Sequence, residues 1–413
     1  MDLQIKDQAR DRAILAAIDC GEYDAENSMD ELEELVGTAG ADVVARVIQK
    51  RSAPEASTLL GEGKIEEIAE LAEKLEANLL ILDCELSPSQ SRNIEAATKI
   101  RVIDRTVLIL DIFAGRAVTN EGKLQVELAQ LKYMLPRLAG LGTSLSRLGG
   151  GIGTRGPGET KLETDRRHIK RRIDKLSDEL EELKTRRDFS RSRRKKDNVL
   201  TAAIVGYTNV GKSTLLNKLT NAGVLAENKL FATLDLTSRG IELPDGRSVL
   251  LIDTVGLIRR LPHNLVEAFK STLEEAACAD IILHVCDISD PEVSEKVKVT
   301  NEILSELGCC DIPVVNVLNK CDLMPNEIQE TADTIKISAK TGEGLDRLLV
   351  AVSKNLPESS ERMKLLFPYD KGGLAAQIRV NGKILSEEYA EDGIIVDALV
   401  DKILVKQMSE FQI

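Results

Sequence analysis

The chain has 413 residues, 43% of them hydrophobic, and a formal net charge of −13, which indicates about three globular domains of roughly 150 residues each. Seven cysteines form no CxxC pair and only three histidines are present, so neither a disulfide framework nor a Cys/His zinc site is expected. The first residues are charged, and no apolar run reaches the ~18 residues that a membrane helix needs. We therefore expect a cytoplasmic, monomeric protein with no membrane span.

The first 115 residues predict an α/β subdomain without catalytic residues. Apolar runs at 43–49 and 78–83 predict buried strands, and residues 65–75 have the period of an amphipathic helix between them. Strand–helix–strand alternation favours a small α/β unit. The glycines of LLGEGK at 59–64 match no phosphate-binding spacing, so a scaffold or docking role is expected.

Residues 116–197 predict a long antiparallel helical hairpin. Apolar residues recur at intervals of 4, 3, 4 and 3 along two segments, a spacing typical of helices that pack along one seam. The positions are Leu124, Leu128, Leu131, Leu135 and Leu138 in the first segment, and Ile169, Ile173, Leu176, Leu180 and Leu183 in the second. The stretch GGGIGTRGPGET at 149–160 then lies at the tip. We expect the second helix to cover about 161–190 and the polar residues 190–198 to form a linker.

The second helix is basic although the whole chain is acidic. Residues 166–196 contain fourteen lysines and arginines and six acidic residues, and such a local excess attracts phosphate backbones. Only 3% of the residues are aromatic, which argues against base stacking. We expect contacts to RNA phosphates, and a solvated coiled coil with an exposed tip is the alternative. The expected contact residues are Arg147, Arg155, Lys161, Arg166, Arg167, Lys170, Arg171 and Arg172.

GYTNVGKST at 206–214 predicts a phosphate-binding loop. It satisfies GxxxxGK[ST], follows the apolar LTAAIV and precedes the helical pattern STLLNKL, which is the context that a P-loop requires. Its backbone N–H groups can bind phosphates, Lys212 supplies charge to the β- and γ-phosphates, and Ser213 offers a hydroxyl to Mg²⁺. Because strand–helix alternation continues from here, we predict a Ras-like GTPase domain over 198–356.

The residues after this domain are less informative. LPESSERMK at 356–364 predicts a second linker. Residues 357–413 as a whole predict a small C-terminal α/β domain, for which the sequence indicates no role.

NKCD at 319–322 and SAK at 338–340 predict that the base is guanine. NKCD follows the apolar VVNVL, at a strand end where open α/β sheets bind ligands. The Asp322 carboxylate can accept hydrogen bonds from guanine N1–H and its exocyclic amine, whereas adenine offers no such pair of donors. A backbone amide of SAK can reach the guanine carbonyl oxygen. GTP and GDP are therefore the expected ligands.

DTVG at 253–256 and FATLD at 231–235 predict the two switch segments. Asp253 follows the apolar VLLI and can hold Mg²⁺ through a water, and the Gly256 amide can sense a γ-phosphate. The first switch should supply a threonine to the metal. Thr233 is favoured by its place in FATLD, and Thr237 and Ser238 compete with it.

One catalytic group is missing from this pattern. Many GTPases carry a water-orienting glutamine directly after the DxxG glycine, but Leu257 stands there and cannot orient water. Asn209 either helps to bind a monovalent cation such as K⁺ beside the phosphates or only stabilises the loop. Slow intrinsic turnover that rises when a partner binds is expected.

Beyond these general motifs, the sequence resembles the HflX GTPases of translation over about residues 36–355. The similar stretches are GEGKIEEI, LSPSQSRN, VIDRTVLILDIF, EGKLQVELAQL, LSRLGGGIGTRGPGETKLETDRR, and IRRLP after DTVG. The last 50 residues resemble, more weakly, an extra domain of many bacterial members. Three positions depart from the family pattern, which usually has phenylalanine at Leu257, often aspartate at Arg260, and commonly proline at Leu236.

The resemblance implies a GTPase that binds the large ribosomal subunit, with the hairpin and its glycine-rich loop reaching ribosomal RNA. It further implies that the protein dissociates stalled or idle ribosomes under stress, and that the large subunit stimulates hydrolysis. The alternatives are a GTPase of ribosome assembly or RNA modification, and a nucleotide-gated RNA-binding protein with incidental hydrolysis.

The resemblance also supports Thr233 as a Mg²⁺ ligand beside Ser213. The expected catalytic residues are Lys212, Thr233 and Asn209. The residues expected to contact the nucleotide are Gly206, Tyr207, Thr208, Asn209, Val210, Gly211, Lys212, Ser213, Phe231, Ala232, Thr233, Leu234, Asp235, Asp253, Thr254, Val255, Gly256, Asn319, Lys320, Cys321, Asp322, Ser338, Ala339 and Lys340.

Overall fold

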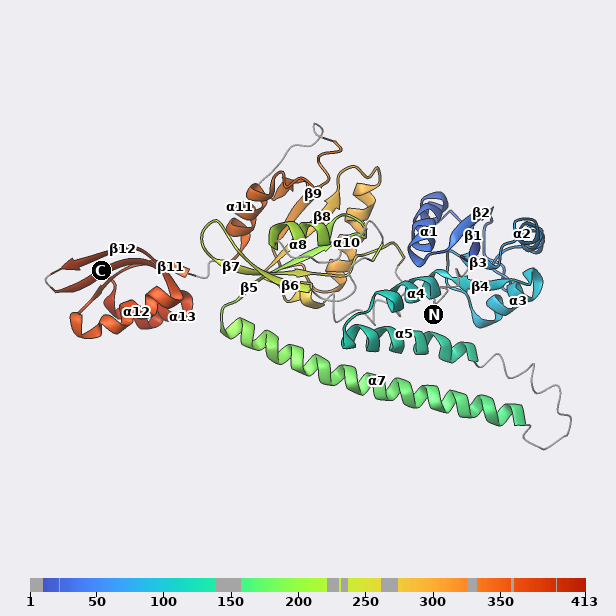
Figure 1. Cartoon of the computed structure of the whole chain (residues 1–413), viewed down its shortest axis with the longest axis horizontal. Coiled ribbons are helices and arrows are strands. Elements are labelled where there is room, and N and C mark those ends of the chain that lie inside the picture. The colour runs from blue at the N-terminus through green and yellow to red at the C-terminus, as the bar shows by residue number, and fades with distance from the viewer. Residues whose placement is uncertain are drawn as a thin grey trace, which may run out of the picture. The chain divides into compact units, whose positions relative to one another are not determined.

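The computed structural model describes residues 10–21, 23–138, 157–220, 230–231, 237–260, 274–324, 333–357, 360–390 and 392–413. The chain divides into two compact units, 1–195 with 199–354, and 355–413 with 196–198. The predicted α/β fold class is confirmed (Figure 1), while the predicted domain boundaries at 115, 197 and 356 stay predictions. Among the residues described, no helix is both long and apolar enough to cross a lipid bilayer.

The larger unit begins with a four-stranded parallel sheet in the order β2-β1-β3-β4. The central strands are buried along almost their whole length, as expected when helices cover both faces of a parallel sheet. Helix α1 buries Met29, Leu32 and Leu35, and its polar side carries Asp30, Glu31 and Glu34. The elements are β1 Arg12–Asp19, α1 Ala25–Ala39, β2 Asp42–Lys50, α2 Glu62–Lys74, β3 Leu79–Leu82, α3 Pro88–Thr98, β4 Arg101–Asp104 and α4 Arg105–Arg116.

Two helices, α5 (Asn120–Leu138) and α7 (Pro157–Lys196), lie side by side (Figure 1). Their shared core contains Leu124, Leu128 and Leu176, with Leu131, Ile173, Leu180 and Leu183 packed around it. Arg172 pairs with Glu127 and Arg187 with Glu121, so the helices run antiparallel. The predicted hairpin is confirmed for this seam, whereas the tip residues 139–156 lie outside the described residues.

Two predicted linkers are wrong in part. Helix α7 continues to Lys196 through residues predicted as a linker, because Arg191 and Arg194 both pair with Glu275, which is only 5% exposed. The second predicted linker overlaps β11 (Ser360–Phe367), whose alternate residues from Met363 onward are buried. In both cases tertiary contacts outweigh the local polarity of the sequence.

The larger unit continues with a six-stranded sheet in the order β10-β9-β8-β5-β7-β6. All neighbours are parallel except β6, which runs antiparallel to β7. β5 lies near the centre and all its residues are buried, so the loop that follows it starts from a fixed position. The elements are β5 Leu200–Gly206, α8 Lys212–Thr220, β6 Thr237–Glu242, β7 Ser248–Asp253, β8 Ile281–Asp287, α10 Val293–Glu306, β9 Val314–Asn319, β10 Thr334–Lys336 and α11 Leu345–Asn355.

The smaller unit is an antiparallel sheet in the order β11-β13-β12 with two helices. Met363, Phe367 and Val396 of the strands pack with Ile378 and Met408 of the helices in one core. The other elements described are α12 Gly372–Asn381, β12 Gly382–Ala390, β13 Gly393–Asp401, α13 Lys402–Met408 and two short 3-10 helices, Tyr369–Lys371 and Ser409–Phe411.

Candidate nucleotide-binding site

The end of β5 and the loop that follows it have glycine at two positions where a Cβ would clash. A Cβ on Gly206 would lie 2.2 Å from the carbonyl oxygen of Val285, and one on Gly211 would lie 2.4 Å from Asn319 Nδ2. Both residues also have positive φ angles, which favour glycine. The motif glycines therefore allow the loop to pack against β8 and β9.

Lys212 is the first residue of α8 and lies inside the loop. Its Nζ donates hydrogen bonds to the carbonyl oxygens of Gly206 at 3.1 Å and Tyr207 at 2.7 Å. The side chain is almost completely buried. Burial lowers the pKa of Lys212 to about 8, an effect that the charge of Asp253 opposes.

This pKa predicts a pH dependence of nucleotide affinity. If the ammonium form binds phosphate as the P-loop motif predicts, nucleotide binding raises the pKa of Lys212, and affinity is lost where the free protein deprotonates. We expect GDP affinity to be constant below about pH 7 and to fall above about pH 8, approaching tenfold per pH unit. Titrations with fluorescent GDP between about pH 7 and pH 9.5 measure this. Lys212→Met should bind weakly without that pH dependence, and an equal slope in this variant would contradict the assignment.

Ser213 and Asp253 place two oxygen donors side by side. Ser213 Oγ donates a hydrogen bond to Asp253 Oδ2 at 2.9 Å, and Asp253 is completely buried at the end of β7. Hydroxyl and carboxylate oxygens are the donors that Mg²⁺ prefers, so these residues fit the predicted metal site. The other predicted ligand, Thr233, lies outside the described residues, as do Ala232, Leu234 and Asp235.

The base-recognition motif is joined to the P-loop by Asn319, the last residue of β9. Its Nδ2 donates to the Val210 carbonyl oxygen at 2.7 Å, and its Oδ1 accepts a hydrogen bond from the Ala339 amide at 2.9 Å. One side chain thus connects three predicted segments. Ser338 and Cys321 are buried beside it, whereas Asp322 and Lys340 are exposed. Lys320 pairs with Asp287 at 2.5 Å.

The DTVG segment is hydrogen-bonded to the P-loop. The Thr208 amide donates to the Leu257 carbonyl oxygen at 2.8 Å, and the Leu257 amide donates to the Gly206 carbonyl oxygen at 3.2 Å. Thr254 and Val255 are buried within this segment. The Leu257 side chain packs in the hydrophobic core with Ala203 and Ile282. The residue at the glutamine position therefore faces the core.

Phe231 is the first residue of the predicted first switch FATLD, and the structure describes this residue of the segment. It is buried, and its ring makes an edge contact with Phe113 of α4, with the ring centroids 4.6 Å apart. Its contact to the nucleotide stays a prediction.

Tyr207 connects the P-loop to α1 of the first sheet. Its hydroxyl accepts a hydrogen bond from the Arg259 amide at 2.6 Å and donates one to the Glu31 carboxylate. Burial, followed by the charge of Glu31, raises the pKa of Tyr207 above its usual value. The hydroxyl is therefore a neutral donor at physiological pH.

Arg105, the first residue of α4, also pairs with Glu31, the partner of Tyr207. It is 2% exposed and pairs with Glu31 at 2.5 Å and Asp83 at 2.8 Å. Burial opposes its charge, but the two carboxylates outweigh burial and raise the pKa of Arg105. Asp83 also pairs at 3.0 Å with Arg260, which lies four residues after the DTVG segment. The first sheet thus holds the P-loop and the second switch by charged contacts.

The sequence gives no indication of these four residues, Glu31, Asp83, Arg105 and Arg260, as a group. They are ordinary charged residues, and Asp83 and Arg260 are 177 positions apart.

A polar cavity of about 190 Å³ lies between α1 and the P-loop, lined among others by Glu31, Thr208 and Asn209.

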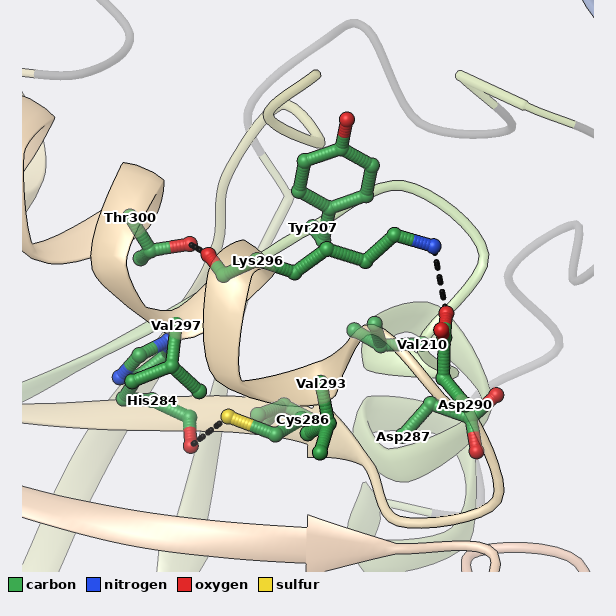
Figure 2. A pocket seen from close by; sticks show the side chains of 11 residues that line it. Tyr207, Val210, His284, Cys286, Asp287, Asp290, Val293, Lys296, Val297 and Thr300 are labelled. Atoms are coloured by element: carbon green, nitrogen blue, oxygen red, sulfur yellow. Dashed lines mark hydrogen bonds and ion pairs between the residues drawn. The ribbon is translucent and has the colours of Figure 1, made fainter. Parts of the chain in front are cut away.

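A second, narrower cavity lies between β8 and α10 (Figure 2). Lys296 pairs with Asp290 at 2.5 Å at one end of it, and Thr300 donates a hydrogen bond to the Lys296 carbonyl oxygen. His284 lines this cavity and is buried, and burial lowers the pKa of His284 to about 4. This histidine is therefore neutral at physiological pH.

The sequence matches three family models in chain order. Residues 26–114 match the GTP-binding GTPase N-terminal domain, residues 116–194 the GTP-binding GTPase middle region, and residues 201–320 the 50S ribosome-binding GTPase. Together the three models cover most of the chain.

Curated proteins are similar over nearly the full length. GTPase HflX of Lacrimispora saccharolytica is 53% identical over 408 residues, which cover 98% of this chain and 96% of that protein. GTPase HflX of Escherichia coli is 42% identical over 394 residues, covering 94% and 92%. A solved GTP-binding protein of Sulfolobus solfataricus in complex with GDP is 28% identical, with a TM-score of 0.45, covering 83% of this chain and 98% of that one.

Proposed function

The chain belongs to the HflX family of ribosome-associated GTPases, and from this premise we propose that it binds the large ribosomal subunit and dissociates stalled or idle ribosomes under stress. It hydrolyses GTP to GDP and phosphate. We place it in the cytoplasm as a monomer that associates with ribosomes.

The proposed roles of the site residues follow from their positions. Lys212 and the P-loop amides neutralise the β- and γ-phosphates, and the Gly256 amide senses the γ-phosphate. Asn319 holds the base-recognition loop against the P-loop, so that Asp322 reads the guanine edge. Ser213, Thr233 and, through a water, Asp253 would hold Mg²⁺, which neutralises charge on the phosphates.

Asn209 has two candidate roles, and replacing K⁺ by Na⁺ in the assay distinguishes them. Its φ of 61° lies in the left-handed region, which asparagine tolerates better than most residues, so the loop conformation alone accounts for it. If its side chain also helps to hold K⁺, the cation supplies charge where it develops in the transition state. We then expect turnover to fall about tenfold when Na⁺ replaces K⁺. Equal turnover in the two salts would leave Asn209 with the loop role only.

The observation that carries the ribosome proposal is the basic helix α7. Arg166, Lys170 and Arg171 are exposed and, within the described part of the chain, form no ion pair. Unpaired cations on a rigid helix can bind RNA phosphates without competition from neighbouring carboxylates. We propose that this helix carries the glycine-rich tip to ribosomal RNA.

Ion pairs also join helix α7 to the predicted GTPase domain. Arg191 Nη2 and Glu275 Oε1 are 2.8 Å apart, and Arg194 lies 3.4 Å from the same carboxylate. Glu275 is nearly buried and lies on the segment that follows the second switch. A change in that switch can therefore reach the arm through one ion-pair cluster.

Sedimentation of intact ribosomes with the protein tests this function. We expect free subunits to accumulate with GTP or a non-hydrolysable analogue, and fewer with GDP. Intact ribosomes under all three conditions would contradict the dissociation role while leaving GTP hydrolysis untouched.

A further inference from the structure

The position of Leu257 leaves the attacking water without its usual partner. Its side chain packs in the core with Ala203 and Ile282 and is 1% exposed. Hydrolysis of GTP nevertheless needs a polar group that orients a water in line with the γ-phosphate. Such a group must lie close to both Lys212 and Gly256, which flank the γ-phosphate position.

Thr208 meets this requirement. A Cβ built on Gly256 would lie 2.7 Å from Thr208 Cγ2 and 3.2 Å from Lys212 Nζ, so these three residues converge at one place. The Thr208 backbone is held there by the hydrogen bond from its amide to the Leu257 carbonyl oxygen. The Thr208 Cα therefore cannot move away without breaking the contact between the two loops.

The Thr208 hydroxyl is also buried without a hydrogen-bond partner among the described residues. The residue is 6% exposed, and among the residues that the structure describes its Oγ1 has no hydrogen-bond partner. Buried hydroxyls are nearly always hydrogen-bonded, and an exception requires an explanation. A hydroxyl can accept one hydrogen bond and donate another at the same time, so it suits a water next to a phosphate.

We propose that Thr208 is a catalytic residue of GTP hydrolysis, whose Oγ1 accepts a hydrogen bond from the attacking water and donates one to a γ-phosphate oxygen. The water oxygen forms a bond to the γ-phosphorus while the bond to the β–γ bridging oxygen breaks. GDP leaves with that electron pair, and the protons of the water remain on the released inorganic phosphate. This role concerns hydrolysis by the protein alone and does not depend on the ribosome.

Thr208→Val tests the hydroxyl, because valine keeps the shape and the methyl contact with Gly256. We expect kcat of intrinsic GTP hydrolysis to fall by about tenfold to a hundredfold, with KM for GTP and the affinity for GDP unchanged. Thr208→Ser keeps the hydroxyl and should restore most of kcat. The affinity for GDP with aluminium fluoride, which imitates the transition state, should fall in the valine variant alone.

The matched control is Thr300→Val, which removes a buried hydroxyl on α10 that donates to the Lys296 carbonyl oxygen (Figure 2). It should leave kcat within about twofold of the parent, because Thr300 lies outside the motif residues. Unchanged kcat in Thr208→Val would overturn the proposal. So would an equal loss in the valine and serine variants, or a loss of GDP affinity in the valine variant, since either result indicates a packing role.

Discussion

Asp322→Asn should convert a guanine-specific site into one that prefers xanthine. The aspartate is proposed to accept two hydrogen bonds from guanine, and charge-assisted bonds contribute about 1.5–3 kcal/mol each. Losing both should weaken GTP binding by about two to four orders of magnitude. The asparagine amide can instead donate to the carbonyl oxygen that xanthine has at the same position, so affinity for XTP should rise. Competition of GTP and XTP for fluorescent GDP measures both changes.

The exposed position of Asp322 makes this variant informative, since no packing is disturbed. Asp311→Asn is the matched control, because Asp311 is also exposed but lies before β9, away from the nucleotide motifs. The control should bind GTP as the parent does. Unchanged selectivity in Asp322→Asn would show that another group reads the base.

Removing the glycine-rich tip should separate nucleotide chemistry from ribosome action. Deletion of residues 149–156, which ends where α7 begins, leaves the packed seam between α5 and α7 in place. We expect GDP affinity and intrinsic GTP turnover to stay within about twofold of the parent. Ribosome dissociation, measured by sedimentation, should fall below detection, because the proposed RNA contact is lost.

A variant with the same eight positions replaced by a Gly-Ser sequence of equal length controls for spacing. It removes Arg155 and Ile152 but keeps the chain length. Full dissociation activity in this variant would show that the tip sequence has no role. Loss of GDP binding in the deletion would show that the tip contributes to the nucleotide site, which contradicts its proposed role as an RNA contact alone.

The sequence allowed the GTPase fold and most of the candidate site to be predicted because their residues form contiguous motifs. A P-loop needs its glycines and lysine at fixed spacing, and Asn319 and Asp322 stand together at one strand end. The seam of the hairpin was predictable for a similar reason, since a helix repeats its buried face every three or four residues.

Contacts between distant segments could not be predicted in this way. Glu31 lies in α1 and Asp83 directly after β3, and their partners Tyr207 and Arg260 lie more than 170 positions away. A carboxylate on a helix has the same local pattern whether it is solvated or pairs with a buried arginine. The extent of α7 was underestimated for the same reason, because Glu275 is far from the arginines that it binds.

The charged contacts around Arg105 suggest how the first sheet takes part in the GTPase cycle. Glu31 holds Tyr207 of the P-loop, and Asp83 holds Arg260, four residues after the DTVG segment. If the second switch rearranges as predicted, we expect these contacts to break or shift.

GTP turnover with and without purified large ribosomal subunits tests the central claim most directly. We predict slow turnover by the protein alone, since Leu257 supplies no amide to the attacking water and only the Thr208 hydroxyl is proposed to contact it, and a rise of at least about tenfold with the large subunit. Co-sedimentation with the large subunit should be strongest in the presence of a non-hydrolysable GTP analogue. Unchanged turnover, together with no co-sedimentation in the analogue state, would contradict the proposed action on the large subunit.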